Sequence, residues 1–155
     1  MQLNLKNSIA FFDLEATGTN VSTDRIVEIS IVKLNPDGGQ QIYTRRVNPG
    51  VPIPLEASLI HGLYDKDLKN EPFFKDLAQE VFQFIGLSDL AGFNVLKYDI
   101  PLLVEEFLRS GIVFDLDKRN LLDAQKIFHL MEKRNLSAAY KFYCGKKLEN
   151  AHSAE

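Results

Sequence analysis

Two acidic side chains, Asp13 and Glu15, stand at the end of the apolar segment 9–12. If this segment is a β-strand, positions i and i+2 face the same side, so both carboxylates point together. Like charges held this close repel each other, and a divalent cation is the simplest compensation. Hard oxygen ligands suit Mg²⁺ or Mn²⁺. The pair therefore indicates a metal site, with two exposed acids at a strand end as the simpler alternative.

Asp99, a third acidic side chain, stands at the start of an expected helix, shortly after Gly92-Phe93-Asn94. Its local sequence favours an N-capping role, and the alternative is a third carboxylate that faces the first two. Asn94, at a strand end, could hydrogen-bond a substrate. Thr17 and Gly18 follow the first acidic pair and could offer a hydroxyl donor and a close approach to the backbone. On its own, a Thr-Gly pair after a strand indicates only a turn.

Two histidines are candidates for the chemistry. His152 could act as a general base, because the unperturbed pKa of an imidazole lies near neutrality. A single histidine near a chain end is more commonly an ordinary surface residue. His61, in the segment Ile60-His61-Gly62, could either pack its own loop or contact a substrate.

The elements that must position these residues begin with strands. Apolar and β-branched residues predict a meander of three strands over 8–14, 25–34 and 41–47, with a turn at 36–39. Shorter strands are predicted over 89–94 and 112–114.

Helical spacing dominates the later part of the chain. It predicts helices over 73–85, 100–108, 121–131 and 136–143, and three prolines indicate an extended loop over 48–54. Strands that come first as a meander and then alternate with helices predict an α/β fold, a mixed sheet with helices packed on it.

Composition limits the class of protein. The 155 residues suit a single domain, 1–155, and 45% hydrophobic with 25% charged residues is ordinary for a globular chain. A net charge of −3 excludes a strongly basic coat for gripping nucleic acid. The single cysteine excludes an internal disulfide, and no apolar run approaches the roughly 18 residues of a membrane span. We expect a soluble, cytoplasmic protein without a membrane partner.

The order of the motifs resembles the DEDDh (DnaQ-like) family of 3′–5′ exonucleases, which includes the proofreading subunit of bacterial DNA polymerase III. The motifs are Asp13-x-Glu15-x-Thr17-Gly18, then Ile60-His61-Gly62, then Gly92-Phe93-Asn94 with Asp99, then Ala151-His152. Each is weak alone, but four in this order are specific, and the similarity spans residues 8–155. The resemblance implies a ribonuclease H-like fold with a five-stranded mixed sheet and flanking helices.

The resemblance also implies roles for individual residues. Asp13, Glu15 and Asp99 match the acids that hold two divalent ions, Mg²⁺ or Mn²⁺, and His152 matches the histidine that activates the attacking water. Ala16, Thr17 and Gly18 match the segment that meets the terminal sugar, where the family often has Thr in place of Ala16. The remaining matches surround the pocket for the last nucleotide: Ile60, His61, Phe93 and Asn94. Lys97, Lys146 and Lys147 are candidates for further contacts with the strand.

One motif departs from the family. The family places an aspartate five positions after the histidine, and that position lies two residues beyond Glu155. The C-terminal helix that would carry this fourth carboxylate is missing too. We expect a chain truncated at its C-terminus that binds divalent ions poorly and cleaves slowly at best.

Three functions remain open on the sequence. The first is a two-metal 3′–5′ exonuclease acting on 3′ ends of single-stranded DNA or RNA, in proofreading or repair, with a DNA polymerase subunit as a candidate partner. The second is a non-catalytic nucleic-acid or polymerase-binding module on the same fold. The third, an aspartyl-phosphate phosphatase, is disfavoured because it would need a second Asp where Glu15 stands.

Overall fold

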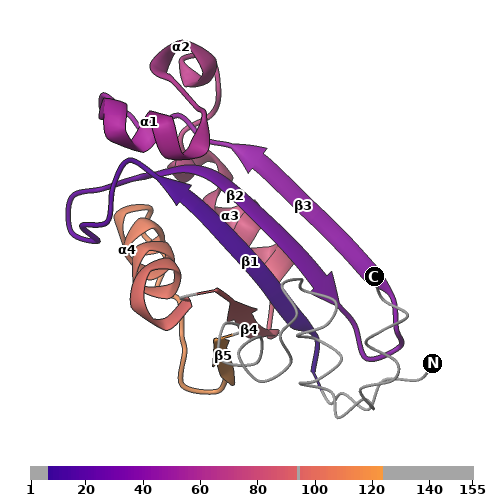
Figure 1. Cartoon of the computed structure of the whole chain (residues 1–155). Coiled ribbons are helices and arrows are strands. Elements are labelled where there is room, and N and C mark those ends of the chain that lie inside the picture. Colours follow the sequence, from indigo (N-terminus) through magenta and orange to yellow (C-terminus); the bar gives the residue numbers. More distant parts are fainter. Residues whose placement is uncertain (1–6, 94, 124–155) are drawn as a thin grey trace.

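A five-stranded mixed sheet forms the centre of the molecule (Figure 1). The computed structural model describes residues 7–93 and 95–123. The strands follow the order β3-β2-β1-β4-β5 across the sheet. Their bounds are β1 (Ile9–Ala16), β2 (Ile26–Leu34), β3 (Gln40–Arg46), β4 (Asp89–Gly92) and β5 (Leu121–Asp123).

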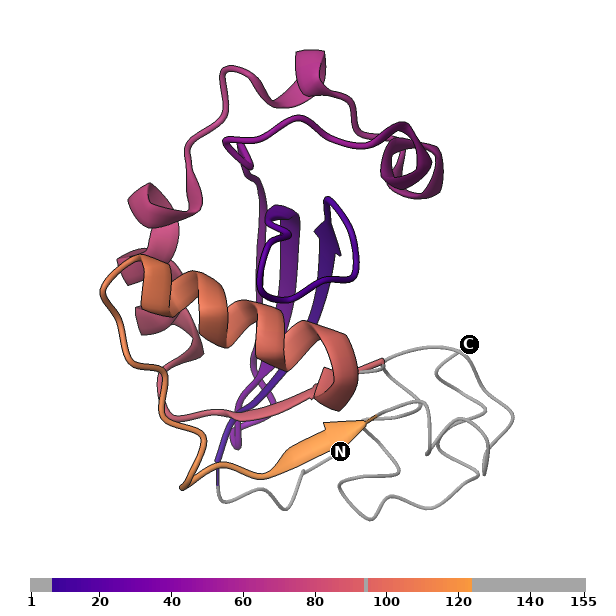
Figure 2. The ribbon, with the colours of Figure 1, turned by 90° about the vertical axis from the view of Figure 1, so that its left-hand side faces the viewer.

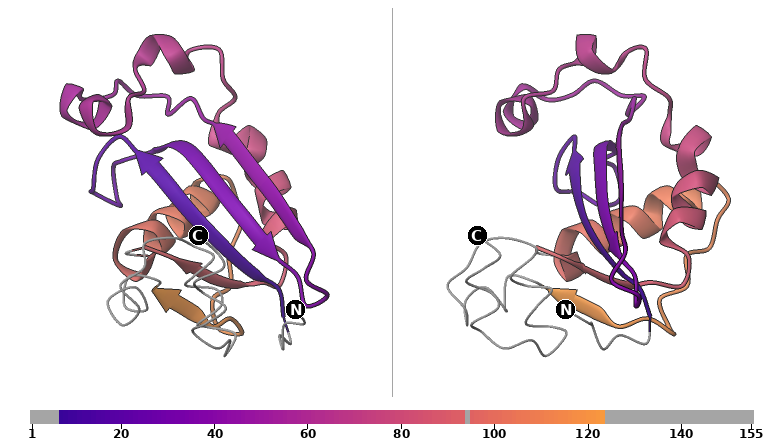
Figure 3. Two further views of the ribbon diagram at one scale, coloured as in Figure 1. Left: turned by 45° about the vertical axis from the view of Figure 1, so that its right-hand side comes forward. Right: turned by 90° about the vertical axis from the view of Figure 1, so that its right-hand side faces the viewer.

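In the described part of the chain, four α-helices and one π-helical turn accompany the sheet. They are α1 (Leu55–His61), α2 (Asp65–Leu68), α3 (Phe74–Ile85), the π-turn η1 (Val95–Asp99) and α4 (Ile100–Arg109). With the sheet seen edge-on, α3 and α4 lie on one side of it, whereas α1 projects beyond the other side (Figures 2 and 3). The end of β1 therefore lies between α1 and the start of α4.

The sheet changes direction at β1. On one side β1 pairs antiparallel with β2, and β2 pairs antiparallel with β3. On the other side β1 pairs parallel with β4, and β4 pairs parallel with β5. Parallel strands end at the same edge of a sheet, so the segments that follow β1, β4 and β5 are brought together.

The main core lies between the sheet and helices α3 and α4. Alternate residues of β1, namely Ala10, Phe12 and Leu14, belong to this buried cluster, together with Val81 of α3 and Phe107 of α4. The ring of Phe107 contacts three other aromatic rings, at centroid distances of 4.9 to 5.9 Å: Phe74, Phe82 and Phe114. This packing fixes α4 against the sheet and therefore fixes where α4 begins.

The structure confirms the predicted α/β fold with a five-stranded mixed sheet and flanking helices. The first four strands and the helices predicted over 73–85 and 100–108 are present within a few residues of the expected bounds. The helix predicted over 136–143 and the C-terminal helix expected to be missing lie outside the described residues.

The position of the fifth strand was predicted wrongly. Residues 112–114 form no strand, and β5 lies at Leu121–Asp123, where the spacing predicted the start of a helix. Phe114 instead stacks on Phe107 in the core, Ile112 packs against this core, and Val113 is exposed. Hydrogen bonds at Asn120 position β5: its N–H donates to Asp89 Oδ1 at 2.8 Å, and its carbonyl accepts from Leu90 N–H at 3.0 Å. The sequence signal also missed α1 and α2.

No helix in the described part of the chain has both the length and the apolar character to cross a membrane.

Replacing Phe107 with Ala should lower the free energy of unfolding by about 3 to 5 kcal/mol, because it removes a fully buried ring and leaves a cavity. Leu108→Ala is the matched control: it lies on the same helix but is 52% exposed, so its effect should be small. Urea denaturation followed by circular dichroism measures both. Equal losses for the two variants would contradict the packing described here.

Candidate active site

The end of β1 presents its two acids on the face opposite the main core. Asp13 and Glu15 alternate with the buried Phe12 and Leu14, so both carboxylates face away from α3 and α4. Asp13 is exposed, and Glu15 is half-buried. The i and i+2 arrangement expected from the sequence is therefore present.

A third acid lies beside this pair on the neighbouring strand. Glu15 is directly opposite Glu28 of β2 in the antiparallel register. Arg46 of β3, paired with Glu28 on its other side, places its Nε 3.9 Å from Glu28 Oε2. Like charges directly opposite each other on a sheet are destabilising. Across these three strands, Arg46 therefore offsets only part of the repulsion between Glu15 and Glu28.

Crowding of these acids alters their titration. Although Asp13 reaches solvent, the protein around its carboxylate displaces part of the water, which raises its pKa; the charge of Glu28 raises it further, and the backbone N–H of Leu14 acts in the opposite direction. Burial also raises the pKa of Glu15, with further contributions from Asp13 and Glu28. Each carboxylate is therefore held against the repulsion of its neighbours.

Asp99 is the second acidic motif, and it does not cap its helix. It is the last residue of η1 and the N-cap residue of α4, it has helical backbone angles, and its side chain makes no capping hydrogen bond. Burial first, and then the charge of Asp13, raise the pKa of Asp99 to about 7, while the backbone N–H of Leu14 lowers it. Glu15 and Asp123 add smaller upward contributions. The alternative to capping, a third carboxylate facing the first two, describes the structure better.

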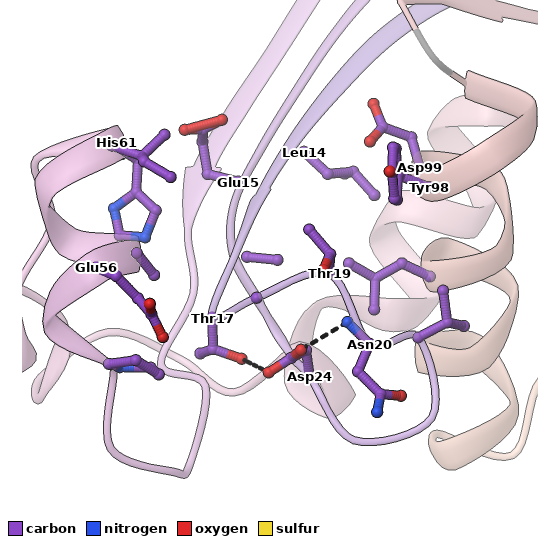
Figure 4. Close-up of a pocket in the computed structure, with 17 residues that line it drawn as sticks. Leu14, Glu15, Thr17, Thr19, Asn20, Asp24, Glu56, His61, Tyr98 and Asp99 are labelled. Carbon is purple, nitrogen blue, oxygen red and sulfur yellow. Dashed lines mark hydrogen bonds between the residues drawn. The ribbon is translucent and has the colours of Figure 1, made fainter.

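A pocket of about 610 Å³ lies next to these acids. It is bounded by the end of β1, the loop after β1, helix α1 and the start of α4 (Figure 4). Glu15 lies at the end of β1, between His61 on one flank and Asp99 on the other (Figure 4). Seven of the residues predicted from the sequence line the pocket: Glu15, Ala16, Thr17, Gly18, Ile60, His61 and Asp99. Asp13 and Phe93 do not line it, and Asn94 and His152 lie outside the described residues.

The loop after β1 is held by Asp24. The Thr17 hydroxyl donates to Asp24 Oδ1 at 2.8 Å, and the backbone N–H of Asn20 donates to Asp24 Oδ2 at 2.8 Å. A Cβ atom at Gly18 would lie 2.5 Å from the same Oδ2, so a side chain at this position would displace the Asp24 carboxylate from its bonds to the loop. The Thr17-Gly18 pair therefore forms part of the pocket wall and does more than make a turn.

His61 enters the pocket from the end of α1. Its Nδ1 accepts a hydrogen bond from the backbone N–H of Leu63 at 3.1 Å. A ring nitrogen that accepts carries no proton, so the proton of the neutral imidazole is on Nε2. Among the described residues, the buried Nε2 has no hydrogen-bond partner. His61 thus packs its own loop through one nitrogen, while its other, protonated nitrogen is buried without a partner among the described residues.

The acids form a donor set that fits a hard divalent cation, because all of them offer oxygen and all repel one another. Within residues 7–93 and 95–123, however, no three His, Cys, Asp or Glu side chains converge closely enough to form a ready metal cluster. The acids therefore suit a divalent cation by the chemistry of their side chains and by their mutual repulsion.

Sequence reasoning missed several residues around the site. Glu28 and Asp123 influence the acids from neighbouring strands, and Asp24, Glu56 and Tyr98 line the pocket. Only the position of Glu28, on the predicted strand 25–34, carried a usable signal, since its pairing register would have placed it beside Glu15. The other contacts depend on loop and helix placement.

The fold and the site together define a class of nuclease. A family model described as an exonuclease, RNase T, matches residues 10–155, and the chain belongs to this family. This confirms the resemblance found in the motifs, and the architecture is that of DnaQ-like 3′–5′ exonucleases.

Three curated proteins show which exonucleases and polymerases the chain is similar to. The chain is 29% identical to the DNA polymerase III subunit epsilon of Buchnera aphidicola, an alignment that covers 97% of this chain and 67% of that protein. It is 25% identical to a PolC-type DNA polymerase III of Clostridium perfringens and 24% identical to the 3′-5′ exonuclease DinG of Staphylococcus haemolyticus. These alignments cover 92% and 96% of this chain, but only 10% and 16% of the two longer proteins.

Solved structures of Escherichia coli exonuclease I share the fold. The complex with a dT13 oligonucleotide matches with a TM-score of 0.71 and 14% identity over 82% of this chain and 30% of that chain. A zinc-bound form of the exonuclease I complex with single-stranded DNA matches with a TM-score of 0.72, at 14% identity over 82% and 30% of the two chains. At this identity the likeness establishes the fold.

Asp99→Asn should stabilise the protein at neutral pH in the absence of divalent ions. Between the ordinary value of 3.8 and the folded value of about 7, the folded protein retains a proton that the unfolded chain releases. Wild-type stability therefore falls as the pH rises through this window and stays lower above it. The variant lacks this loss, so its advantage should be near zero below pH 4 and reach on the order of 2 kcal/mol above pH 7. Denaturation at several pH values in EDTA measures it, and a pH-independent difference would contradict the charge cluster.

Proposed function

We propose that this chain is a metal-dependent 3′–5′ exonuclease domain that removes nucleoside 5′-monophosphates from single-stranded DNA or RNA. One observation carries the proposal: the acids of two separate motifs, Asp13 with Glu15 and Asp99, come together beside a pocket of about 610 Å³, where burial and then the charge of Asp13 raise the pKa of both Glu15 and Asp99. Clustered acids are costly for a fold, and a divalent cation that binds a phosphodiester would offset that cost. The family membership of the chain supports the same reaction.

Asp13, Glu15 and Asp99 would hold two divalent ions, Mg²⁺ or Mn²⁺. When bound, such ions would activate the attacking water and stabilise the leaving oxygen. His152 would accept the proton of that water as a general base. Its imidazole can do so near neutral pH, where an unperturbed histidine is largely unprotonated.

The pocket would hold the last nucleotide of the strand. The segment Ala16-Thr17-Gly18, which lines the pocket, would contact the terminal sugar. His61 would donate from Nε2, and the exposed Ile60 would contact the face of the base. Phe93 and Asn94 would flank the second motif. Contacts of these kinds do not depend on base identity, which suits an enzyme that degrades any sequence.

A role beside a DNA polymerase, in proofreading or repair within the cytoplasm, fits the epsilon-subunit relatives. A non-catalytic nucleic-acid-binding or polymerase-binding module on the same fold is the alternative function. The retained acids favour the enzyme, because a binding module has no physical need for mutually repelling carboxylates.

The reaction is tested with 5′-labelled single-stranded DNA and RNA in Mn²⁺. The protein should be in excess over the strand and sampled over long times, so that cleavage at any rate is detected. Wild type should shorten the strand from its 3′ end one nucleotide at a time. Asp13→Asn should reduce the rate by at least about 100-fold, because it removes a proposed metal ligand. This is the carboxylate whose charge acts on both Glu15 and Asp99.

Asp117→Asn, at an exposed acid in the loop before β5, is the matched control and should retain the wild-type rate. Strand binding without cleavage in wild type would contradict the exonuclease and favour the binding module. Cleavage unaffected by Asp13→Asn would assign the activity to another site or a contaminant.

Replacing Ile60 with Ser should raise KM for a single-stranded substrate about fivefold, because the contact with the terminal base is lost. Ile60 is 84% exposed although it lines the pocket, so the folded state should be little affected. Leu59→Ser, at a neighbour that is 69% exposed and does not line the pocket, is the control. Steady-state kinetics and thermal unfolding distinguish the outcomes, and equal KM changes for both variants would contradict the assignment.

A further inference from the structure

A buried glutamate near the end of α4 is bonded to the strand that follows the pocket loop. Glu106 is only 3% exposed, and its Oε2 accepts a hydrogen bond from the backbone N–H of Ile26 at 2.9 Å. Its Oε1 accepts from Nη1 of Arg109, one turn further along the helix, at 3.3 Å. Both carboxylate oxygens are therefore occupied, and neither residue lines the pocket.

Arg109 extends this contact into the loop between β1 and β2. Its Nη2 donates to the carbonyl oxygens of Ser22 at 2.9 Å and Val21 at 3.3 Å, and its Nη1 donates to that of Asp24 at 3.2 Å. The planar guanidinium presents several donors in a fixed geometry, so one side chain fixes three successive parts of the loop.

The opposite side of the same loop forms the pocket wall. Asp24, whose carbonyl Arg109 holds, uses its carboxylate to hold the Thr17 hydroxyl and the Asn20 N–H. Thr17, Asn20, Val21 and Asp24 all line the pocket. The main chain of the loop is thus bonded to α4 on one side and presents the pocket surface on the other.

We propose that Glu106 and Arg109 are positioning residues that set the substrate-binding loop relative to Asp99. Helix α4 starts directly after Asp99 and ends at Arg109, roughly 15 Å away at 1.5 Å per residue, and the core holds it rigidly against the sheet. One rigid helix therefore fixes both the second acidic motif and the wall that receives the terminal nucleotide. The substrate assigned to this loop rests on the proposed function.

Arg109→Gln tests this role, with Arg119→Gln as a matched control. Arg119 also donates to backbone carbonyls, those of Ser88 at 2.7 Å and Asp115 at 2.9 Å. None of these three residues lines the pocket. Both variants lose charged hydrogen bonds to the main chain, so their effects on global stability should be comparable. Only Arg109→Gln should affect the pocket.

Two measurements are made on each protein. Amide hydrogen exchange reports the protection of residues 17–26, and fluorescence anisotropy in Ca²⁺ reports binding of a labelled single-stranded oligonucleotide. Arg109→Gln should increase exchange in this segment at least tenfold and weaken binding about tenfold, as expected when several hydrogen bonds to a charged group are lost. Arg109→Lys should restore part of both, and Arg119→Gln should change neither.

Unchanged exchange in residues 17–26 would show that Arg109 does not hold this loop, which overturns the proposal. Increased exchange with unchanged strand affinity would overturn its positioning role and leave only a contribution to stability. If wild type binds no strand, the proposed function fails, and the substrate assigned to the loop fails with it. That outcome is distinguishable because the exchange measurement needs no ligand.

Discussion

Electrostatic repulsion among carboxylates at the end of β1 is the constraint on which the site depends. Asp13 and Glu15 share one face of a strand, Glu28 lies opposite Glu15, and Asp99 faces the pair from α4. Burial first, and then the repulsion from Asp13, raise the pKa of Asp99 to about 7. A fold that keeps such a cluster gives up stability, and binding a divalent cation is the physical process that would recover it.

The architecture explains how residues distant in the sequence reach this cluster. Because β1, β4 and β5 are parallel, the segments that follow them meet at one edge of the sheet. The packing of Phe107 in the core then fixes the direction of α4, and with it the position of Asp99 at one end and of Arg109 at the other. The same helix therefore packs in the core and positions residues of the site.

Local sequence predicted the elements with strong periodicity and the acids of the first motif, because strand alternation alone places Asp13 and Glu15 on one face. It failed where tertiary contacts decide. Strand β5 depends on hydrogen bonds between Asn120 and β4. The capping interpretation of Asp99 was favoured by propensity, yet Asp99 ends the π-helical turn with helical backbone angles and its side chain makes no capping hydrogen bond. No spacing rule could reveal that Arg109 binds a loop 85 or more positions earlier.

The most direct test of this account is a Mn²⁺ titration followed by electron paramagnetic resonance, with wild type, Asp13→Asn and the control Asp117→Asn. The account predicts Mn²⁺ binding that is the same in wild type and the control and at least about tenfold weaker in Asp13→Asn, because the removed carboxylate is a hard oxygen ligand. Equal affinity in all three proteins, or no binding in any, would show that the clustered acids are not a metal site and would contradict the central claim.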